Sequence, residues 1–336
     1  MARRTWFPVL TVALVLVALV PVPARAATRT VAAADLADAV RSARPGDTVV
    51  VRGGTYTGTV GWGITPGRRD ARITVKAAPG ARVLIRGTLQ LENADYWTVD
   101  GIDVTTGAAR TQLLVKFDGG TGWRFQNSEV WGSQGVSNVM VTGSARNGLP
   151  RDYRISGNCI HDNDARGDAF MNDHGIYLMP GAGSGPGLIT RNLIYGIPNG
   201  AAVKAAGPNA TDGAASRVTI TRNTMARVAA GVILGHGTHH VTVSRNLVGS
   251  QVVAQRDARW ARNYDAAVVG NHVSGVGNAV RSNALWSFER ALHATDDSRA
   301  IARSGNVRVA PRLTGGYSCD GLRATGATAR NYGRWS

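Results

Sequence analysis

The sequence is poor in cysteine and in aromatic residues. Its 336 residues include 2 cysteines, Cys159 and Cys319, and only 6% are Phe, Trp or Tyr. Two cysteines exclude the multi-bridge framework of a small disulfide-rich secreted domain. Whether they pair in an oxidising compartment or serve as small buried hydrophobic residues stays open at this point. The low aromatic content, together with 42 glycines, argues against a helical bundle.

Long apolar runs are also absent, apart from one near the N-terminus. Residues 6–20 read "WFPVLTVALVLVALV", follow Arg3 and Arg4, and precede Ala24-Arg25-Ala26. This is the order of basic region, apolar region and small-residue cleavage site in a signal peptide. The run is short for a membrane span. We therefore predict a signal peptide over residues 1–26, a secreted mature chain that begins near Ala27, and no membrane-spanning segment.

Acidic residues are scarce relative to basic ones. The formal net charge is +16, and it becomes +13 once Arg3, Arg4 and Arg25 leave with the signal peptide. A basic secreted protein suits anionic polysaccharides, although the charge can also serve solubility alone. The sequence has no arginine-rich arm and no RNA-binding strand motif. We therefore predict that the partner is an anionic polysaccharide and that the protein does not bind nucleic acid. We also expect the protein to be a monomer.

The sequence does contain a repeated motif. Two short apolar strands flank an Asn in segments such as "YRISGNCIHD", "LITRNLIYG", "VTITRNTMAR" and "VTVSRNLVGS". The repeated Asn residues are Asn127, Asn158, Asn192, Asn223, Asn246 and Asn271. Asn tolerates a left-handed bend, and stacked Asn side chains can form hydrogen bonds along the axis of a solenoid. A spacing of roughly 23 to 34 residues is typical of such a repeat.

The stack needs a cover at its open apolar end. The segment "VAAADLADAVRSARPG" predicts an amphipathic helix, with Leu36, Val40 and Ala43 on one stripe, which ends at Pro45-Gly46. We therefore expect an N-terminal cap region over residues 27–46 and a β-helix of about eight to ten coils over residues 47–309. The Gly-rich residues 310–336 are expected to form an irregular C-terminal cover.

The cap segment, the Asn repeat and "YWTVDGIDV" (residues 96–104) together resemble the pectate-lyase-like right-handed parallel β-helix superfamily. The likeness extends from Ala27 to about Val309. It implies a single-stranded right-handed parallel β-helix of three parallel sheets, with an N-terminal α-helical cap and polysaccharide bound along one sheet. Members of the superfamily include polysaccharide lyases, glycoside hydrolases, epimerases and binding proteins, so fold alone does not set the function.

Three successive strands carry candidate site residues. They read "HGIYLMPG" (174–181), "NGAAVKAAG" (199–207) and "AGVILGHG" (230–237). Aligning Gly175, Gly200 and Gly231 predicts that Tyr177 and Lys204 project outward side by side. The Asp-His before the first strand and the Asn-Gly-x-x-x-Lys of the second resemble a pattern of secreted actinobacterial β-helix proteins.

Uronate β-elimination needs a base for a ring proton, a proton donor, and a group that neutralises the carboxylate. Lys204 is the candidate base, and His174 or Tyr177 is the candidate proton donor. Asp173 is expected to orient these groups. Calcium is the candidate cofactor, with Asp168 and Asp173 as its ligands. Further candidates, for substrate binding, are Asn172, Met179, Asn199 and His236.

Two other functions remain open from the sequence. Glycoside hydrolysis needs a pair of carboxylates, which two of four aspartates would supply: Asp162, Asp164, Asp168 and Asp173. A binding protein needs only an exposed aromatic and polar strip. The sequence favours a secreted polysaccharide lyase over both.

Overall fold

A computed structural model describes residues 26–107, 113–163, 173–207, 214–251, 266–309, 311–326 and 330–334. The predicted signal peptide up to residue 25 lies outside these residues, as do Asp164, Asp168 and Asn172. No helix in the described part of the chain has both the length and the apolar character that a membrane crossing requires.

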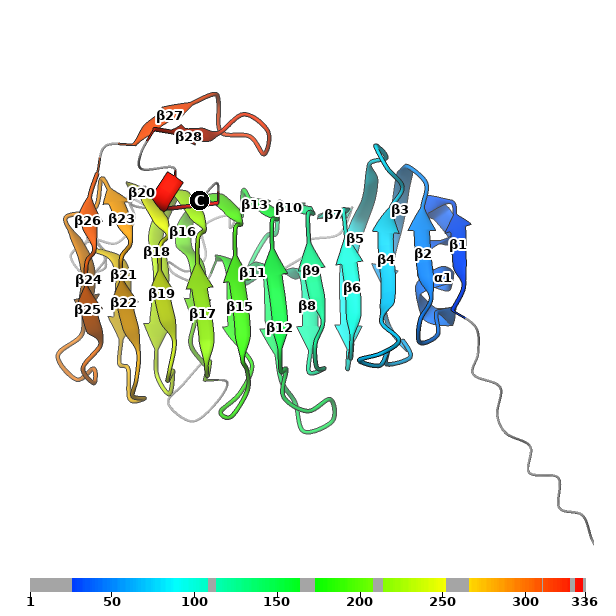
Figure 1. The fold of residues 1–336 in the computed structure, drawn as a ribbon, viewed down its shortest axis with the longest axis horizontal. Coiled ribbons are helices and arrows are strands. Elements are labelled where there is room, and N and C mark those ends of the chain that lie inside the picture. Colours follow the sequence, from blue (N-terminus) through cyan, green and yellow to red (C-terminus); the bar gives the residue numbers. More distant parts are fainter. Residues whose placement is uncertain are drawn as a thin grey trace, which may run out of the picture.

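In the described part of the chain, one face is an eleven-stranded sheet in which each strand pairs in parallel with the next coil (Figure 1). Ten of these strands lie within residues 47–309, where about eight to ten coils are expected, and the first lies in the predicted cap region. The strands, in spatial order, are β1 (Thr28–Val31), β2 (Thr48–Val51), β4 (Ile73–Ala77), β6 (Trp97–Asp100), β9 (Arg124–Gln126), β12 (Tyr153–Ser156), β15 (Gly187–Thr190), β17 (Val218–Thr221), β19 (Thr242–Ser244), β22 (Ala279–Arg281) and β25 (Ala302–Ser304).

The second sheet has fifteen strands among the described residues, and they form two limbs. The first limb contains β7 (Ile102–Thr105), β10 (Glu129–Trp131), β13 (Cys159–His161), β20 (Leu247–Gln251), β23 (Ala284–Trp286) and β26 (Val307–Arg308). The second limb contains β8 (Leu113–Asp118), β11 (Ser137–Thr142), β14 (His174–Met179), β21 (Ala266–Asn271) and β24 (Arg290–Ala294). Long strands join the limbs: β5 (Val83–Glu92), with β3 (Gly54–Val60) paired to it, β16 (Leu193–Ala205) and β18 (Thr224–Gly235). The predicted parallel β-helix is confirmed, with two of its three faces fused.

Alternation along the short strands builds the core. On the first sheet, side chains of one register row stack from coil to coil, and each is at most 2% exposed: Val99, Phe125, Ile155, Ile189, Ile220, Val243 and Val280. A single coil cannot bury such a face, but eleven stacked strands make one continuous apolar interior.

An Asn ladder runs along the corner between the first sheet and the first limb. Asn158 Nδ2 donates to Asn192 Oδ1 at 3.1 Å, and Asn192 Nδ2 donates to Asn223 Oδ1 at 2.9 Å. The chain of side-chain bonds continues to Asn246, Asn283 and Asn306. The predicted hydrogen bonding along the axis is therefore confirmed.

Two predicted members of the ladder are wrong. Ser128, and not Asn127, holds the ladder position one coil before Asn158, because the Ser128 N–H donates to Asn158 Oδ1. Asn271 ends β21 on the second limb, and its expected place belongs to Asn283.

The predicted position of the bend is also wrong, by one residue. The left-handed residues are those just before the ladder, such as Arg191, Arg222 and Arg245, with φ of 56°, 55° and 54°. The ladder positions hold Asn for its amide hydrogen bonds and not for the bend.

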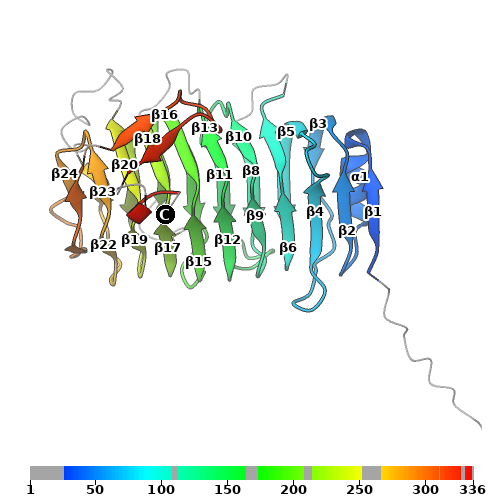
Figure 2. The ribbon, with the colours of Figure 1, turned by 45° about the horizontal axis from the view of Figure 1, so that its top comes forward.

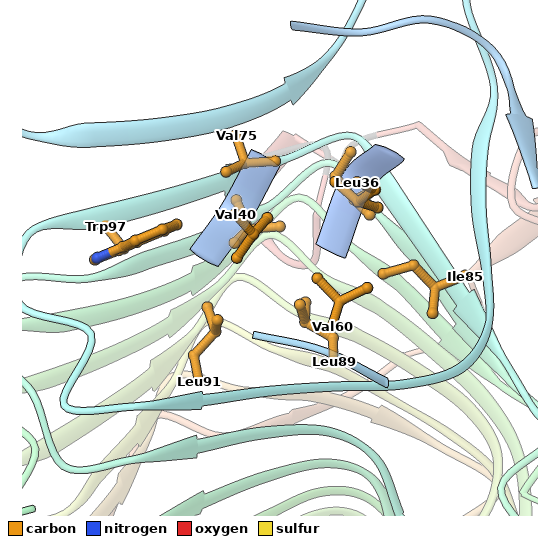
Figure 3. Close-up of a pocket in the computed structure, with 10 residues that line it drawn as sticks. Leu36, Val40, Val60, Val75, Ile85, Leu89, Leu91 and Trp97 are labelled. Carbon is orange, nitrogen blue, oxygen red and sulfur yellow. The ribbon is translucent and has the colours of Figure 1, made fainter. Parts of the chain in front are cut away.

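The helix α1 (Leu36–Ser42) closes the N-terminal end of the stack, as predicted. Figure 3 shows Leu36 and Val40 turned toward Val60, Val75 and Leu91 of the first coils. Leu36 is 1% exposed and Val40 2% exposed. The gap that these side chains leave measures about 10 Å³, room for no more than one water. This gap therefore belongs to the packing of the core beneath the cap helix.

Leu36→Ala is expected to lower the free energy of unfolding by about 2–5 kcal/mol, because a buried Leu is removed and the cap closes the space poorly. Urea denaturation of the mature protein measures the loss. Asp38→Ala on the same helix is the control, since the Asp38 side chain is 88% exposed. Equal, small losses in both variants would contradict a sealing role for α1.

The C-terminal segment lies across the first limb (Figures 1 and 2). It contains an antiparallel pair, β27 (Arg312–Thr314) and β28 (Arg323–Thr325), which the sequence pattern did not predict. A disulfide between Cys159 and Cys319 ties it to β13, with the two Cα atoms 5.6 Å apart. Leu322 packs in the same place against Leu193 and Tyr195. The two cysteines, whose pairing the sequence left open, therefore form a disulfide.

Candidate functional site

An outward row on the second limb carries the candidate groups. The strand register places side chains of adjacent coils next to one another in the order Lys116, Met140, Tyr177, Lys204, Ile233 and Val269. The alternate row, which includes Ile176, Val203 and Val232, faces the core. The predicted adjacency of Tyr177 and Lys204 is confirmed, because they are register partners on β14 and β16.

The glycine alignment that led to this pair is wrong by two residues. Ile176 pairs with Val203, so Gly175 lies opposite Ala202 and not opposite Gly200. An irregularity in β16 between Ile197 and Ala201 causes the shift. Because the shift is even, it leaves the inward and outward assignments intact. Gly200 has another role: a Cβ there would lie 1.6 Å from the Asp173 carbonyl oxygen, so only glycine fits.

Tyr177 and Lys204 form a close pair. Lys204 Nζ lies 4.7 Å from the centroid of the Tyr177 ring. Burial lowers the pKa of the Lys204 amine, because desolvation disfavours its charged form. Burial also raises the pKa of the Tyr177 phenol, which is 7% exposed. Both shifts favour the neutral forms, an amine that accepts a proton and a phenol that donates one.

His174 lies beneath this pair. Its side chain is fully buried, and its Nδ1 accepts a hydrogen bond of 3.1 Å from the Ala201 N–H of the next coil. Its ring meets the Tyr177 ring edge-on, with 5.2 Å between centroids. Asn163 Nδ2 donates to the His174 carbonyl oxygen at 3.1 Å. These contacts fix β14 against β16 and support the Tyr177 ring, which favours Tyr177 over His174 as the proton donor.

A histidine pair follows the next two strands of the limb, with His236 directly after β18 and His272 directly after β21. The rings of His236 and His272 stack with centroids 6.3 Å apart, and His272 Nδ1 bonds the Asp297 carboxylate. The pKa of His236 is lowered by burial, by His272 and by the charge of Lys204. Sequence reasoning identified His236 but missed His272 and Asp297. The available signal was "VVGNHVSG", which was assigned to the structural repeat.

The other predicted residues are scattered. Met179 ends β14 and pairs with Thr142, and Asn199 lies half-buried at the irregular part of β16. Asp173 is 3% exposed, directly before β14. Asp168 and Asn172 lie outside the described residues.

Asp162 belongs to a different cluster. Its Oδ2 lies 2.9 Å from His161 Nδ1 at the end of the first limb. It therefore does not face the outward row of Tyr177 and Lys204.

The described residues offer few ligands for a metal ion. Their one group of His, Cys, Asp and Glu with ligand atoms close enough for an ion consists of Cys159, His161 and Cys319. The disulfide removes both thiolates from that group, and thiolate is the form that binds metals. The predicted calcium ligand Asp168 lies outside the described part of the chain, so calcium stays a prediction.

No protein-family model and no curated protein matches the chain. Solved structures do match. The GH136 lacto-N-biosidase from Eubacterium ramulus shares 10% identity with a TM-score of 0.53, over 84% of this chain and 67% of that one. The alginate lyase from Paenibacillus sp. str. FPU-7 shares 16% identity, with a TM-score of 0.48, over 84% and 95%. Pectate lyase Pel9A shares 14% identity, with a TM-score of 0.44, over 83% and 80%. At these identities the likeness concerns the fold.

Proposed function

We propose that this chain, which has the pectate-lyase-like parallel β-helix fold, is a polysaccharide lyase that cleaves a uronic-acid polymer by β-elimination. The observation that carries the proposal is the contact of 4.7 Å between Lys204 Nζ and the Tyr177 ring on an outward β-face. The environment gives this pair opposite pKa shifts, and such a separation assigns base and acid.

The chemistry follows from those protonation states. The neutral Lys204 amine removes the proton from C5 of the uronate. The electron pair forms the C4–C5 double bond as the bond from C4 to the glycosidic oxygen breaks. Tyr177 gives its phenolic proton to that leaving oxygen. A proton passed from Lys204 back to Tyr177 through solvent restores both groups.

The uronate carboxylate also needs a partner, because its charge disfavours loss of the neighbouring proton. Lys116 lies two strands from Tyr177 on the same outward row, and it is the cation on this row that we assign to the substrate. Calcium at Asp168 and Asp173 is the alternative partner. Loss of turnover on addition of EDTA, restored by Ca²⁺, would identify calcium.

Secretion is part of the proposal. The disulfide between Cys159 and Cys319 supports it, because disulfides persist mainly in oxidising compartments. The mature chain would begin near Ala27, and N-terminal sequencing of exported protein tests this.

Incubation with acidic and neutral polysaccharides distinguishes the candidate functions. A lyase gives new ultraviolet absorbance from unsaturated uronate ends, and we expect this on at least one acidic polymer. New reducing ends without absorbance would establish the hydrolase alternative and overturn the proposal. Binding without products, across a panel that includes polygalacturonate and alginate, would identify a binding protein.

A further inference from the structure

An exposed tryptophan lies at one end of the outward row on the second limb. Trp62 follows β3 and is 61% exposed, more than any other large apolar residue in the described ranges. Its indole Nε1 donates a hydrogen bond of 3.3 Å to Gln90 Oε1 on β5. A single exposed apolar side chain needs no explanation by itself. Trp62 differs in how its backbone presents it and in where it stands.

Two glycines turn Trp62 toward solvent. Val60, two residues earlier, is 1% exposed and faces the core (Figure 3). Strict alternation along a strand would turn Trp62 to the same side. Gly61, with φ of 111°, breaks the alternation, and Gly63 follows with φ of 71°. A Cβ at Gly61 would lie 2.6 Å from the Gln90 carbonyl oxygen, so only glycine fits against β5. The turn therefore holds the indole outward on a fixed support.

The strand register connects Trp62 to the proposed catalytic pair. The outward row continues one strand beyond Lys116, toward the N-terminus. From that end to the pair, its members are Gln90, Lys116, Met140, Tyr177 and Lys204. Adjacent strands lie about 4.8 Å apart, so the four steps from Gln90 to Lys204 span about 19 Å. Trp62 therefore extends the row that holds the pair, and its indole lies about 19 Å or more from Lys204.

The row is most accessible at the Trp62 end. Gln90 and Lys116, next to Trp62, are half-buried. Met140 and Ile233, on either side of the catalytic pair, are buried. A long polymer that reaches the pair can therefore contact the row most fully on the side of Trp62.

We propose that Trp62 forms a distal sugar-binding subsite, in which the indole stacks on a pyranose unit of the polymer that the catalytic pair cleaves. The face of an aromatic ring carries the negative part of its quadrupole, and it attracts the C–H groups that a pyranose ring presents on one side. One sugar unit is about as long as the spacing between coils, so a chain of about five units reaches from Trp62 to Lys204. The subsite would favour long chains over short fragments. The identity of the polymer, but not the stacking, rests on the proposed lyase function.

The test is calorimetric binding of saturated hexamers prepared from polygalacturonate and from alginate. All proteins carry Lys204→Arg, so that the hexamers are not cleaved during the measurement. Trp62→Ala removes the aromatic ring, and Trp62→Phe keeps one. Tyr317→Ala is the matched control, because Tyr317 is also an exposed aromatic residue, at 38%, but lies in the C-terminal segment between β27 and β28. Thermal unfolding confirms that each variant folds.

We expect Trp62→Ala to raise the Kd for at least one hexamer about tenfold, because it removes an aromatic contact with the sugar. Trp62→Phe should raise the Kd less than about threefold, since a phenyl ring also stacks. Tyr317→Ala should stay within about twofold of the parent. Acrylamide quenching gives a second readout, because a bound hexamer should shield an exposed indole in the parent and not in Trp62→Phe.

Two results would overturn the inference: the same Kd for Trp62→Ala as for its parent, or no parental binding of either hexamer at millimolar concentration. Failure of the lyase is a separate outcome. Binding that depends on Trp62, without unsaturated products from the chain with Lys204 intact, would keep the subsite in a binding protein. Unsaturated products that form equally well in Trp62→Ala would keep the lyase and remove the subsite. Where products form, the loss in Trp62→Ala should appear in KM and not in kcat, because stacking far from the reacting bond is the same in ground state and transition state.

Discussion

Lys204→Arg should lower kcat on the cleaved polysaccharide by roughly 10²- to 10⁴-fold, the range expected when a general base is lost. Arginine keeps the positive charge and most of the length of the side chain, but its guanidinium stays protonated at any working pH. It therefore cannot accept the C5 proton. KM should change little, because Lys116, which is assigned to the substrate carboxylate, is unchanged. Initial rates from ultraviolet absorbance measure both constants.

The pH profile tests the same assignment independently. Burial lowers the pKa of Lys204 and raises that of Tyr177. The active form has a neutral amine and a neutral phenol. The rate should therefore rise with pH as Lys204 loses its proton and fall only as Tyr177 ionises at higher pH. Tyr177→Phe should remove most of the turnover, and any residual activity should lack the alkaline fall.

The control is Lys116→Arg on the same outward row. Lys116 is assigned to the substrate carboxylate, which arginine also binds, so kcat should stay within a few-fold of the parent value. If Lys204→Arg and Lys204→Ala both retain near-parental turnover, Lys204 is a surface charge. Hydrolysis by a carboxylate pair that includes Asp168 and Asp173 then becomes the leading reaction.

The fold was predictable because its determinants are local and repeated. An apolar strand, an Asn and a second strand recur at one spacing, and each copy makes the same hydrogen bonds as the next. Leu36 and Val40 on one helical stripe likewise predict a cap without knowledge of its contacts. The errors concern single positions. Asn127 and Asn271 match the repeated motif but lie off the ladder, since the pattern in sequence does not distinguish a ladder Asn from other Asn residues.

The site was predictable only in part. Tyr177 and Lys204 come from adjacent strands, so strand alternation alone brings them together. His272 and Asp297 are brought next to His236 by later coils, and their loops have no repeat that the sequence could reveal. Asp162 shows the opposite error. It is near Asp173 in sequence, yet its carboxylate contacts His161, because Asp162 follows β13 of the first limb whereas Asp173 precedes β14 of the second limb.

The ladder gives the largest expected loss of stability. In Asn223, Oδ1 accepts from the N–H and the Nδ2 of Asn192 at 3.0 and 2.9 Å. Its Nδ2 donates to the Ile189 carbonyl oxygen at 2.9 Å and to Asn246 Oδ1 at 3.0 Å. All of these groups are buried. Asn223→Ala leaves several of them without a partner, and each such group costs about 1–3 kcal/mol.

Asn223→Ala should therefore lower the free energy of unfolding by about 4 kcal/mol or more, as measured by urea denaturation. Asn306→Ala is the matched control, because Asn306 ends the described ladder and is only half-buried. Water can replace its bonds, so its loss should be near 1 kcal/mol. The double variant Asn192→Ala/Asn223→Ala should lose less than the sum of its single variants, because those two residues are each other's partners. Additive losses, or equal losses at Asn223 and Asn306, would show that the side chains act separately and that apolar stacking alone holds the coils in register.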